Sequence, residues 1–221
     1  MESTVDPRLG KWIRWLDDIK IDVQKLLIYK HIFHELQGII SNNKDIQKPS
    51  VFYQYVADTY VAYVTIGIRR QVKCDSTSIS LVRLLSEIKD TPYLLSRTYY
   101  KNLYLSNPYK DLADKHFDRI VGSGNQHIQI KTVEHDLSGL NKTATIIEEY
   151  ADKKIAHHDK RAPKKIPRFT DVNTCLNTLD KTCCRYHKIF HATGYQTFMP
   201  TFQYDWKEIF REPWIKKRII S

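Results

Sequence analysis

The sequence predicts an all-α fold: an up-down bundle of long antiparallel helices with a short C-terminal docking segment. Glycine and proline are scarce, at 7 and 8 of 221 residues, which disfavours a β fold built on many turns. Apolar residues recur at steps of three and four over long stretches, a spacing that places them on one face of a helix. We expect residues 1–192 to form the bundle and residues 193–221 to form an aromatic and basic tail packed on it.

The first two helices are expected to be long. The first runs from about 7 to 40, with Asp6 as its N-cap and a proline in its first turn. The second runs from about 51 to 72 and ends on Arg69 and Arg70. Both arginines suit the negative end of a helix dipole, so helix capping is one explanation for them.

The middle of the chain is less regular. A short helix is expected from about 79 to 88, where Ser78 can serve as its N-cap. Residues 93–125 show the weakest pattern, with one helix at about 112–121 that a Gly-Ser-Gly sequence ends.

The stretch from about 126 to 156 carries the clearest helical pattern. Its apolar positions alternate steps of four and three, which makes a narrow heptad-like seam. Such a seam suits either antiparallel packing inside a bundle or a dimer interface. The seam residues are Val133, Leu137, Leu140, Ala144, Ile147, Ala151 and Ile155.

A basic, proline-containing loop at 158–168 follows this helix. The last long helix is expected from about 172 to 192, capped by Thr170 or Asp171.

The composition narrows the classes of function. The net charge of +10 favours a phosphate-bearing partner, and we expect RNA. The four cysteines include the adjacent Cys183 and Cys184 and form no spaced pair, which argues against a disulfide framework and a zinc module. Free thiols favour a reducing compartment. No signal peptide and no apolar run of ~20 residues is seen, so we expect a cytoplasmic protein without a membrane span.

The strongest site candidate lies where the seam helix ends. His157 and His158 are adjacent there, and a neutral imidazole can both accept and donate a proton near pH 7. Asp152 and Asp159 are placed to orient an imidazole. The surrounding cations can bind phosphate and stabilise a charged transition state. These cations are Lys153, Lys154, Lys160, Arg161, Lys164, Lys165 and Arg168.

A simpler explanation stands beside this one. Lysine and histidine at a helix C-terminus complement the helix dipole, and basic loops are usually only solvated. A metal site and a cofactor are not expected, because adjacent histidines suit a shared ion poorly and no third ligand has matching spacing.

Two segments of the chain resemble a known family. Residues 152–159 (DKKIAHHD) are similar to a polar-Lys-x-x-Ala-His-x-Asp helix ending, and residues 68–70 (IRR) with 78–85 (SISLVRLL) are similar to a Ser-Leu-x-x-Leu-Leu segment after a second long helix. Together with the predicted bundle they resemble the HEPN superfamily, in its bacterial abortive-infection (AbiU-type) branch.

The resemblance implies a dimer of bundles that cleaves RNA without a metal, using an arginine, a polar residue and a histidine. Carried over to this chain, the histidine is His157 and the polar residue is Asp152. Ala151 stands where the family has its arginine. Lys153, or a more distant Arg69, Arg70 or Arg161, is left to supply that charge.

Three functions therefore remain open. The first is a phage-defence (abortive-infection) protein that acts as a metal-independent endoribonuclease. The second is a catalytically inactive RNA- or partner-binding module. The third is a regulatory helical protein that binds a cognate defence or antitoxin protein through its aromatic tail.

Overall fold

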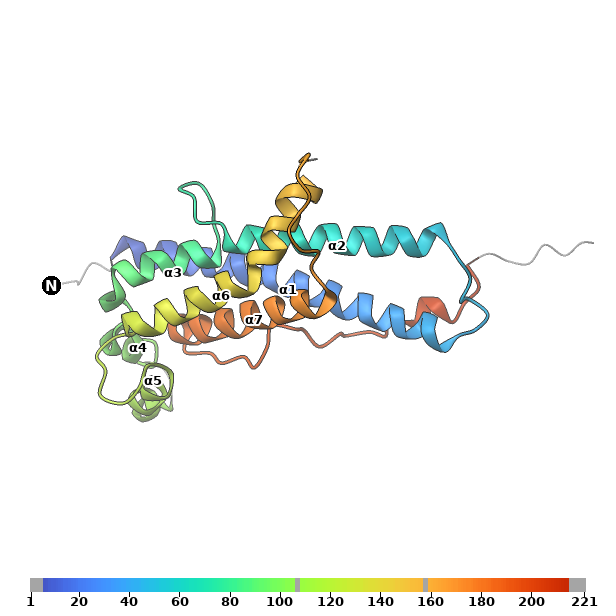
Figure 1. Cartoon of the computed structure of the whole chain (residues 1–221). Coiled ribbons are helices and arrows are strands. Elements are labelled where there is room, and N and C mark those ends of the chain that lie inside the picture. Colours follow the sequence, from blue (N-terminus) through green and yellow to red (C-terminus); the bar gives the residue numbers. More distant parts are fainter. Residues whose placement is uncertain (1–5, 106–107, 157–158, 215–221) are drawn as a thin grey trace, which may run out of the picture.

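The computed structural model of the chain describes residues 6–105, 108–156 and 159–214. It confirms the all-α fold: the described residues contain no strand, only one isolated antiparallel bridge between Ser96 and His127. Four long helices run alternately in opposite directions along the molecule (Figure 1). They are α1 (Pro7–Asn42), α2 (Val51–Val72), α6 (Ile130–Tyr150) and α7 (Phe169–His191).

Shorter elements complete the bundle. Helix α3 (Leu81–Asp90) packs on α1, α2 and α6. Helices α4 (Arg97–Asn102) and α5 (Ala113–Val121) gather at the end of the bundle where α1 begins (Figure 1). Three 3₁₀ turns are also present, at Pro92–Leu94, Lys110–Leu112 and Glu208–Phe210.

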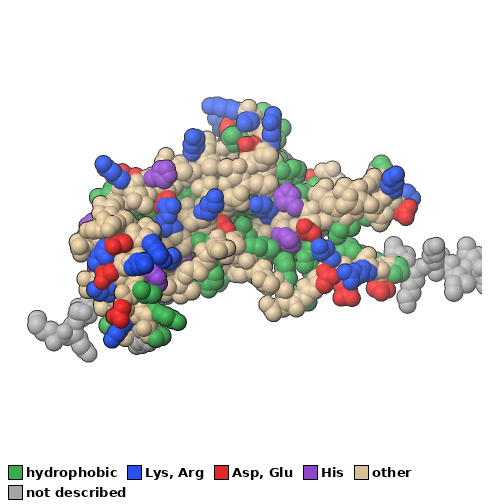
Figure 2. Space-filling model, turned by 90° about the horizontal axis from the view of Figure 1, so that it is seen from below, with side chains coloured by type: hydrophobic (Ala, Val, Ile, Leu, Met, Phe, Trp, Pro, Cys, Tyr) green, Lys and Arg blue, Asp and Glu red, His purple; other side chains and the backbone are tan. Residues whose placement is uncertain are grey.

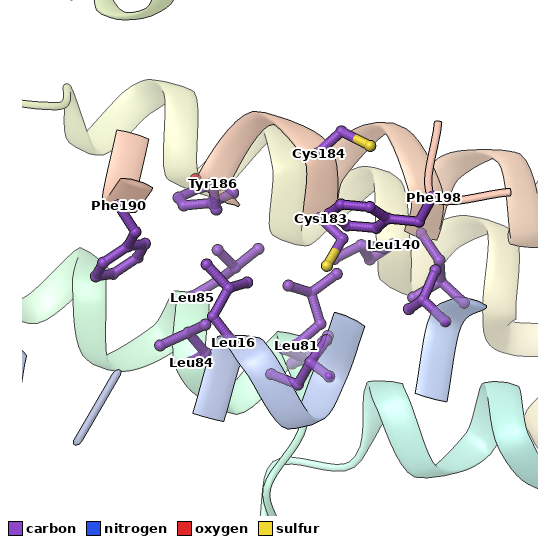
Figure 3. Packing of buried hydrophobic residues seen from close by; sticks show 14 of the residues in the cluster. Leu16, Leu81, Leu84, Leu85, Leu140, Cys183, Cys184, Tyr186, Phe190 and Phe198 are labelled. Carbon is purple, nitrogen blue, oxygen red and sulfur yellow. The ribbon is translucent and has the colours of Figure 1, made fainter. Parts of the chain in front are cut away.

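One apolar core joins the long helices. Leu16, Leu84 and Leu85 are fully buried between α1 and α3, facing the α7 side chains Tyr186 and Phe190 (Figure 3). Packing of this kind removes apolar surface from water and is the main source of the bundle's stability.

The cysteines are free thiols, and three of the four are buried in the bundle. In Figure 3 the sulfur of Cys183 points into the leucine cluster, whereas Cys184 points away from it. Only Cys74 is exposed. Burial raises the pKa of Cys175 to about 11, which leaves that thiol unreactive near neutral pH.

The seam of α6 is used inside the bundle. Val133, Leu140, Ala144, Ile147 and Ala151 are all fully buried, and α6 packs on α7, α2 and α3. Of the two uses open at the sequence level, the seam therefore serves intramolecular packing.

Several helix ends differ from the prediction. Helix α3 begins two residues later, because Ser80 rather than Ser78 is the N-cap and accepts a hydrogen bond from Arg83 N at 3.0 Å. Helix α7 begins earlier, at Phe169, with Arg168 as the N-cap; the Asp171 carboxylate accepts from Arg168 N at 2.8 Å. Thr170 and Asp171, the two expected N-caps, therefore lie inside the helix, and Asp171 completes the cap from the third helical position.

The described part of the tail lies against the bundle. Phe198 is buried, and its backbone N–H donates to Asp180 of α7 at 2.9 Å. Farther along, Lys207 pairs with Glu35 of α1 at 2.8 Å. The division of the chain into two units at residue 192 stays a prediction.

Among the described residues, no helix combines the length and the apolarity that a membrane span requires.

Candidate functional site

The α-helical hydrogen bonding of α6 stops at Tyr150. Ala151–Ala156 continue the helix as a single π-helical turn. Such wider turns are rare and frequently lie at functional sites. Ala151 is fully buried by the seam, and Asp152 and Lys153, which follow it, are partly exposed. His157 and His158, the predicted catalytic histidines, lie outside the described residues.

An arginine from another helix meets this turn. Arg69 lies in the last turn of α2, and its Nε donates to Asp152 Oδ1 in an ion pair across 83 residues of sequence. The Arg69 side chain is 25% exposed, so it is partly desolvated but still reachable from solvent. The structure therefore brings a guanidinium to the position at which the sequence of α6 itself supplies none.

A glutamate that the sequence analysis did not select ties the basic loop to the helix. Glu149 Oε1 accepts from Lys153 Nζ at 2.8 Å and from the backbone N of Lys164 at 3.2 Å. Lys153 Nζ also donates to the carbonyl of Ala162 at 3.3 Å. The hydrogen bond from Lys153, followed by that from Lys164, lowers the pKa of Glu149. The signal for Glu149 was present in the sequence, as a Glu-Lys pair four residues apart.

Asp159 is bound by its neighbour Arg161. Its carboxylate accepts from the Arg161 backbone N at 2.9 Å and from the guanidinium at 3.1 and 2.8 Å. The hydrogen bond from the Arg161 side chain, with that from its backbone, lowers the pKa of Asp159 to about 2. Asp159 is therefore ionised at neutral pH and its lone pairs are largely used by Arg161.

These side chains line one hollow of about 500 Å³. Five of the predicted residues meet there, joined by Glu149. The hollow is lined by Arg69, Glu149, Asp152, Lys153, Asp159 and Arg161. Cations and carboxylates alternate in it and are paired with each other. To bind here, a phosphate would have to displace a carboxylate from its cation, so that one anion would replace another.

The other predicted cations do not line this hollow. Arg70, next to Arg69 in sequence, points to α1 and pairs with Asp22 at 3.2 Å. Arg168 borders a separate, mainly apolar hollow with Tyr60 and Phe169. Lys164 reaches the site only through its backbone N–H. The exposed Lys154, Lys160 and Lys165 surround the hollow without lining it.

A second hollow, which unlike the first is lined by basic side chains alone among its charged groups, was not anticipated from the sequence. It measures about 580 Å³, lies between α5, α6 and α7, and has no carboxylate in its lining. Its charged or titratable lining residues are Arg119, Lys131, His135, Arg185 and Lys188. Sequence patterns could not reveal this hollow, because its residues come from three helices and are not clustered as a charged segment in the sequence.

Basic side chains also occur outside the two hollows, on the face seen in Figure 2. On the face seen in Figure 2, Lys and Arg occur along the whole length of the molecule, with Asp and Glu among them. The charge of this face is therefore not gathered into a single stripe. In the two hollows described above, by contrast, at least three charged side chains from different elements lie together.

Comparison of the chain with protein-family models, with curated proteins and with solved structures finds no match in any of the three. The resemblance to the HEPN superfamily thus rests on the two motif segments and the all-α bundle, and it stays a prediction.

Proposed function

We propose that this protein acts on RNA as a metal-independent endoribonuclease of HEPN type, in abortive-infection defence against phage. The observation that carries the proposal is the ion pair between Arg69 and Asp152. It gives the end of α6 the arginine that the resemblance requires and that Ala151 does not provide. A guanidinium is the cation best suited to bind a phosphate in two-point fashion.

The proposed chemistry needs a proton acceptor and a proton donor beside a bound phosphate. The 2′-oxygen forms a bond to phosphorus and the bond from phosphorus to the 5′-oxygen breaks. His157 and His158 are the groups proposed to take the 2′-hydroxyl proton and to protonate the leaving oxygen. Arg69, Lys153 and Arg161 stabilise the additional negative charge on the phosphate oxygens.

Asp152 receives a different role from the one its sequence position suggested. Its carboxylate accepts from Arg69, so it positions the guanidinium rather than an imidazole. Asp159 likewise positions Arg161. Both carboxylates are thus proposed as positioning residues for cations.

The local charge supports an anionic partner. Between residues 149 and 168, seven lysines and arginines stand against three acidic residues. The second basic hollow, lined by Arg119, Lys131 and Arg185 among others, adds cations near the start of α6. A long anion such as RNA can contact both places, and its binding should weaken with salt.

The test uses purified protein and a single-stranded RNA in EDTA. Cleavage by the wild type and its loss in His157→Ala would support the proposal. His34→Ala is the matched control, because His34 is an exposed histidine of α1 paired with Asn173 at 3.3 Å. No cleavage by the wild type, or equal cleavage by the His157 variant, contradicts the proposal.

A second candidate function is a non-catalytic RNA-binding module. It is favoured by the pairing inside the hollow, where Asp152 and Asp159 are both engaged by arginines rather than left free. It predicts salt-sensitive RNA binding without cleavage, and weaker binding when Lys164 and Lys165 are both changed to Glu. Unchanged affinity in that double variant would count against it.

We also propose that the active form is a homodimer, as the resemblance implies, and that a cognate defence or antitoxin protein controls it. The mass of the particle in solution, measured by light scattering at several concentrations, tests the first part. Co-expression with candidate defence or antitoxin proteins tests the second part.

A further inference from the structure

Three metal-ligand side chains meet where α1 passes the last turns of α7. They are Asp17 of α1 and His187 and His191 of α7. One ligand atom from each of the three lies within 4.8 Å of the other two. The two histidines are four residues apart on one helix, which places them on the same face, one turn from each other.

The ring of His187 is buried and held in one orientation. Its Nδ1 lies 3.3 Å from the carbonyl oxygen of Thr193. Because a carbonyl oxygen can only accept, Nδ1 carries the proton and Nε2 carries the free lone pair. The rings of Tyr195 and Phe198 pack edge-on against it, with centroids at 5.1 and 5.5 Å. A backbone carbonyl behind an imidazole is the usual outer partner of a metal-binding histidine.

His191 carries the feature that points to a ligand. Its Nε2 is buried and makes no hydrogen bond among the described residues. The nearest acceptor is Asp17 Oδ1, at 3.4 Å, which is long for a hydrogen bond and close for two ligands of one ion. Buried polar atoms are nearly always satisfied, so an unpartnered ring nitrogen that faces a carboxylate and a second imidazole indicates a missing partner.

We propose that Asp17, His187 and His191 bind a divalent transition-metal ion of the Zn²⁺ class. Two imidazoles and one carboxylate form a common set for such an ion, with water at the fourth position. The sequence did not suggest this site, because its third ligand lies 170 residues before the histidine pair in the chain. The ion would join α1 to the point where α7 ends and the tail begins.

The surroundings limit the affinity but leave the ligands free. Lys20, one turn after Asp17, is the nearby cation; its Nζ lies 4.7 Å from the Tyr195 ring centre and 5.4 Å from that of Phe198. A positive charge there opposes a dication, so binding should be weaker than in a site without it. No arginine or lysine is paired with Asp17 among the described residues.

The proposed metal site is separate from the hollow at the end of α6, where RNA cleavage is proposed. His187 is 18 residues beyond the start of α7, which is roughly 27 Å along the axis at ~1.5 Å per residue, and the basic loop lies at that start. RNA cleavage in EDTA is therefore expected to be independent of this ion. Failure of either proposal leaves the other standing.

The test measures Zn²⁺ binding to the full, reduced chain by titration calorimetry, in a Cys74→Ser background that removes the exposed thiol. Asp17→Asn and His191→Gln should each weaken binding at least about tenfold. Both side chains are partly exposed, at 52% and 27%, so these variants are expected to fold, which circular dichroism checks. His34→Gln, at an exposed histidine, should bind as the parent does.

A second readout is thermal unfolding. Zn²⁺ that binds only the folded chain raises the melting temperature of the protein. Above the dissociation constant, the rise grows with the logarithm of the free Zn²⁺ concentration. The shift should appear in the parent and shrink in both ligand variants. Absence of Zn²⁺ binding, or equal affinity in parent and variants, would overturn the proposal and assign any bound ion to other histidines.

Discussion

Ala151 occupies a position that could not accommodate an arginine. The side chain is fully buried between α6 and its neighbours, so an arginine at this position would carry its charge into the core. Arg69 enters from the end of α2 and reaches Asp152, the next residue. The buried Ala151 and the neighbouring Arg69–Asp152 ion pair together place a guanidinium at the surface of the turn rather than in the core.

Part of this residue-level arrangement was predictable. The spacing of the seam places Ala151 on the buried face and leaves Asp152 and Lys153 on its flank, as the structure shows. The partner of Asp152 was not predictable, because the choice between Arg69 and Arg70 depends on how α2 rotates against α6. Successive residues of a helix point about 100° apart around its axis. When Arg69 faces Asp152, Arg70 therefore faces Asp22 of α1 instead.

At the same scale, Glu87 makes a testable contribution to stability. Its Oε2 accepts from Lys11 Nζ at 2.5 Å and from Trp12 Nε1 at 2.8 Å, which links α3 to α1. Glu87→Gln keeps the hydrogen bond from the indole and loses the ion pairs with Lys11 and, at 3.4 Å, with Arg83. We expect it to lower the free energy of unfolding at pH 7 by about 1 kcal/mol, measured by urea denaturation.

The pH dependence of this effect has a defined sign. Burial alone would raise the pKa of Glu87, but the hydrogen bonds from Lys11 and Trp12 outweigh it and the pKa is lowered. A lowered folded-state pKa gives stability that is present above the unfolded value and is lost as the pH falls through the folded value. The gap between wild type and Glu87→Gln should therefore narrow from pH 7 to pH 3. A gap that widens in acid would show that the ion pairs are not its origin.

At the scale of the elements, one glycine sets how closely two helices pack. A Cβ at Gly67 of α2 would lie 2.5 Å from Leu26 Cδ2 and 3.3 Å from Leu26 Cγ. Leu26 is only 2% exposed, so it has little room to move aside. By contrast, a Cβ at Gly38 of α1 meets nothing within 4 Å. The two positions form a matched pair for the same substitution.

Gly67→Ala and Gly38→Ala should have opposite effects. Overpacking costs about 1–3 kcal/mol and exceeds the gain in helix propensity of ~1 kcal/mol, so Gly67→Ala should destabilise the protein. Gly38→Ala should stabilise it by up to ~1 kcal/mol. Urea unfolding of both variants measures the difference, and stabilisation by both would show that α1 and α2 pack less closely than described.

The tail makes a second element-level prediction. Asp180 of α7 is buried and accepts from Thr197 Oγ1 at 2.6 Å and from Phe198 N at 2.9 Å. Asp180→Ala leaves both donors unsatisfied, so we expect a loss of about 1–3 kcal/mol in the free energy of unfolding. Faster amide exchange of Phe198 in the variant would locate the effect in the tail. Unchanged exchange there would mean that the aromatic side chain alone docks the tail.

Helix existence was easier to predict from sequence than helix ends. The long apolar stripes gave α1 and α2 within two residues, since a face that repeats over many turns has one helical solution. The start of α3 was misplaced because Ser78 and Ser80 are both suitable caps by type. The π turn of Ala151–Ala156 could not be recognised from the sequence, because the step of four from Ala151 to Ile155 fits an α-helix equally well.

At the scale of the whole molecule, the bundle brings together what the chain separates. Arg69 and Asp152 meet because α2 and α6 pack side by side, and Asp17 meets His191 because α1 packs on α7. The sequence alone identified most residues of the hollow at the end of α6. It did not identify the contact between Arg69 and Asp152 or the contact between Asp17 and His191. Both contacts depend on the order of the helices around the core, which no single segment encodes.

We propose that Arg69 supplies the arginine of an RNA-cleaving site at the end of α6. The most direct measurement is the rate of cleavage of one single-stranded RNA in EDTA by wild type, Arg69→Gln and Arg70→Gln. Each variant removes one arginine-carboxylate pair from the last turn of the same helix. We expect the rate to fall about 10²–10³-fold in Arg69→Gln and to stay near that of wild type in Arg70→Gln. Equal rates for both variants, with folding intact, would contradict it.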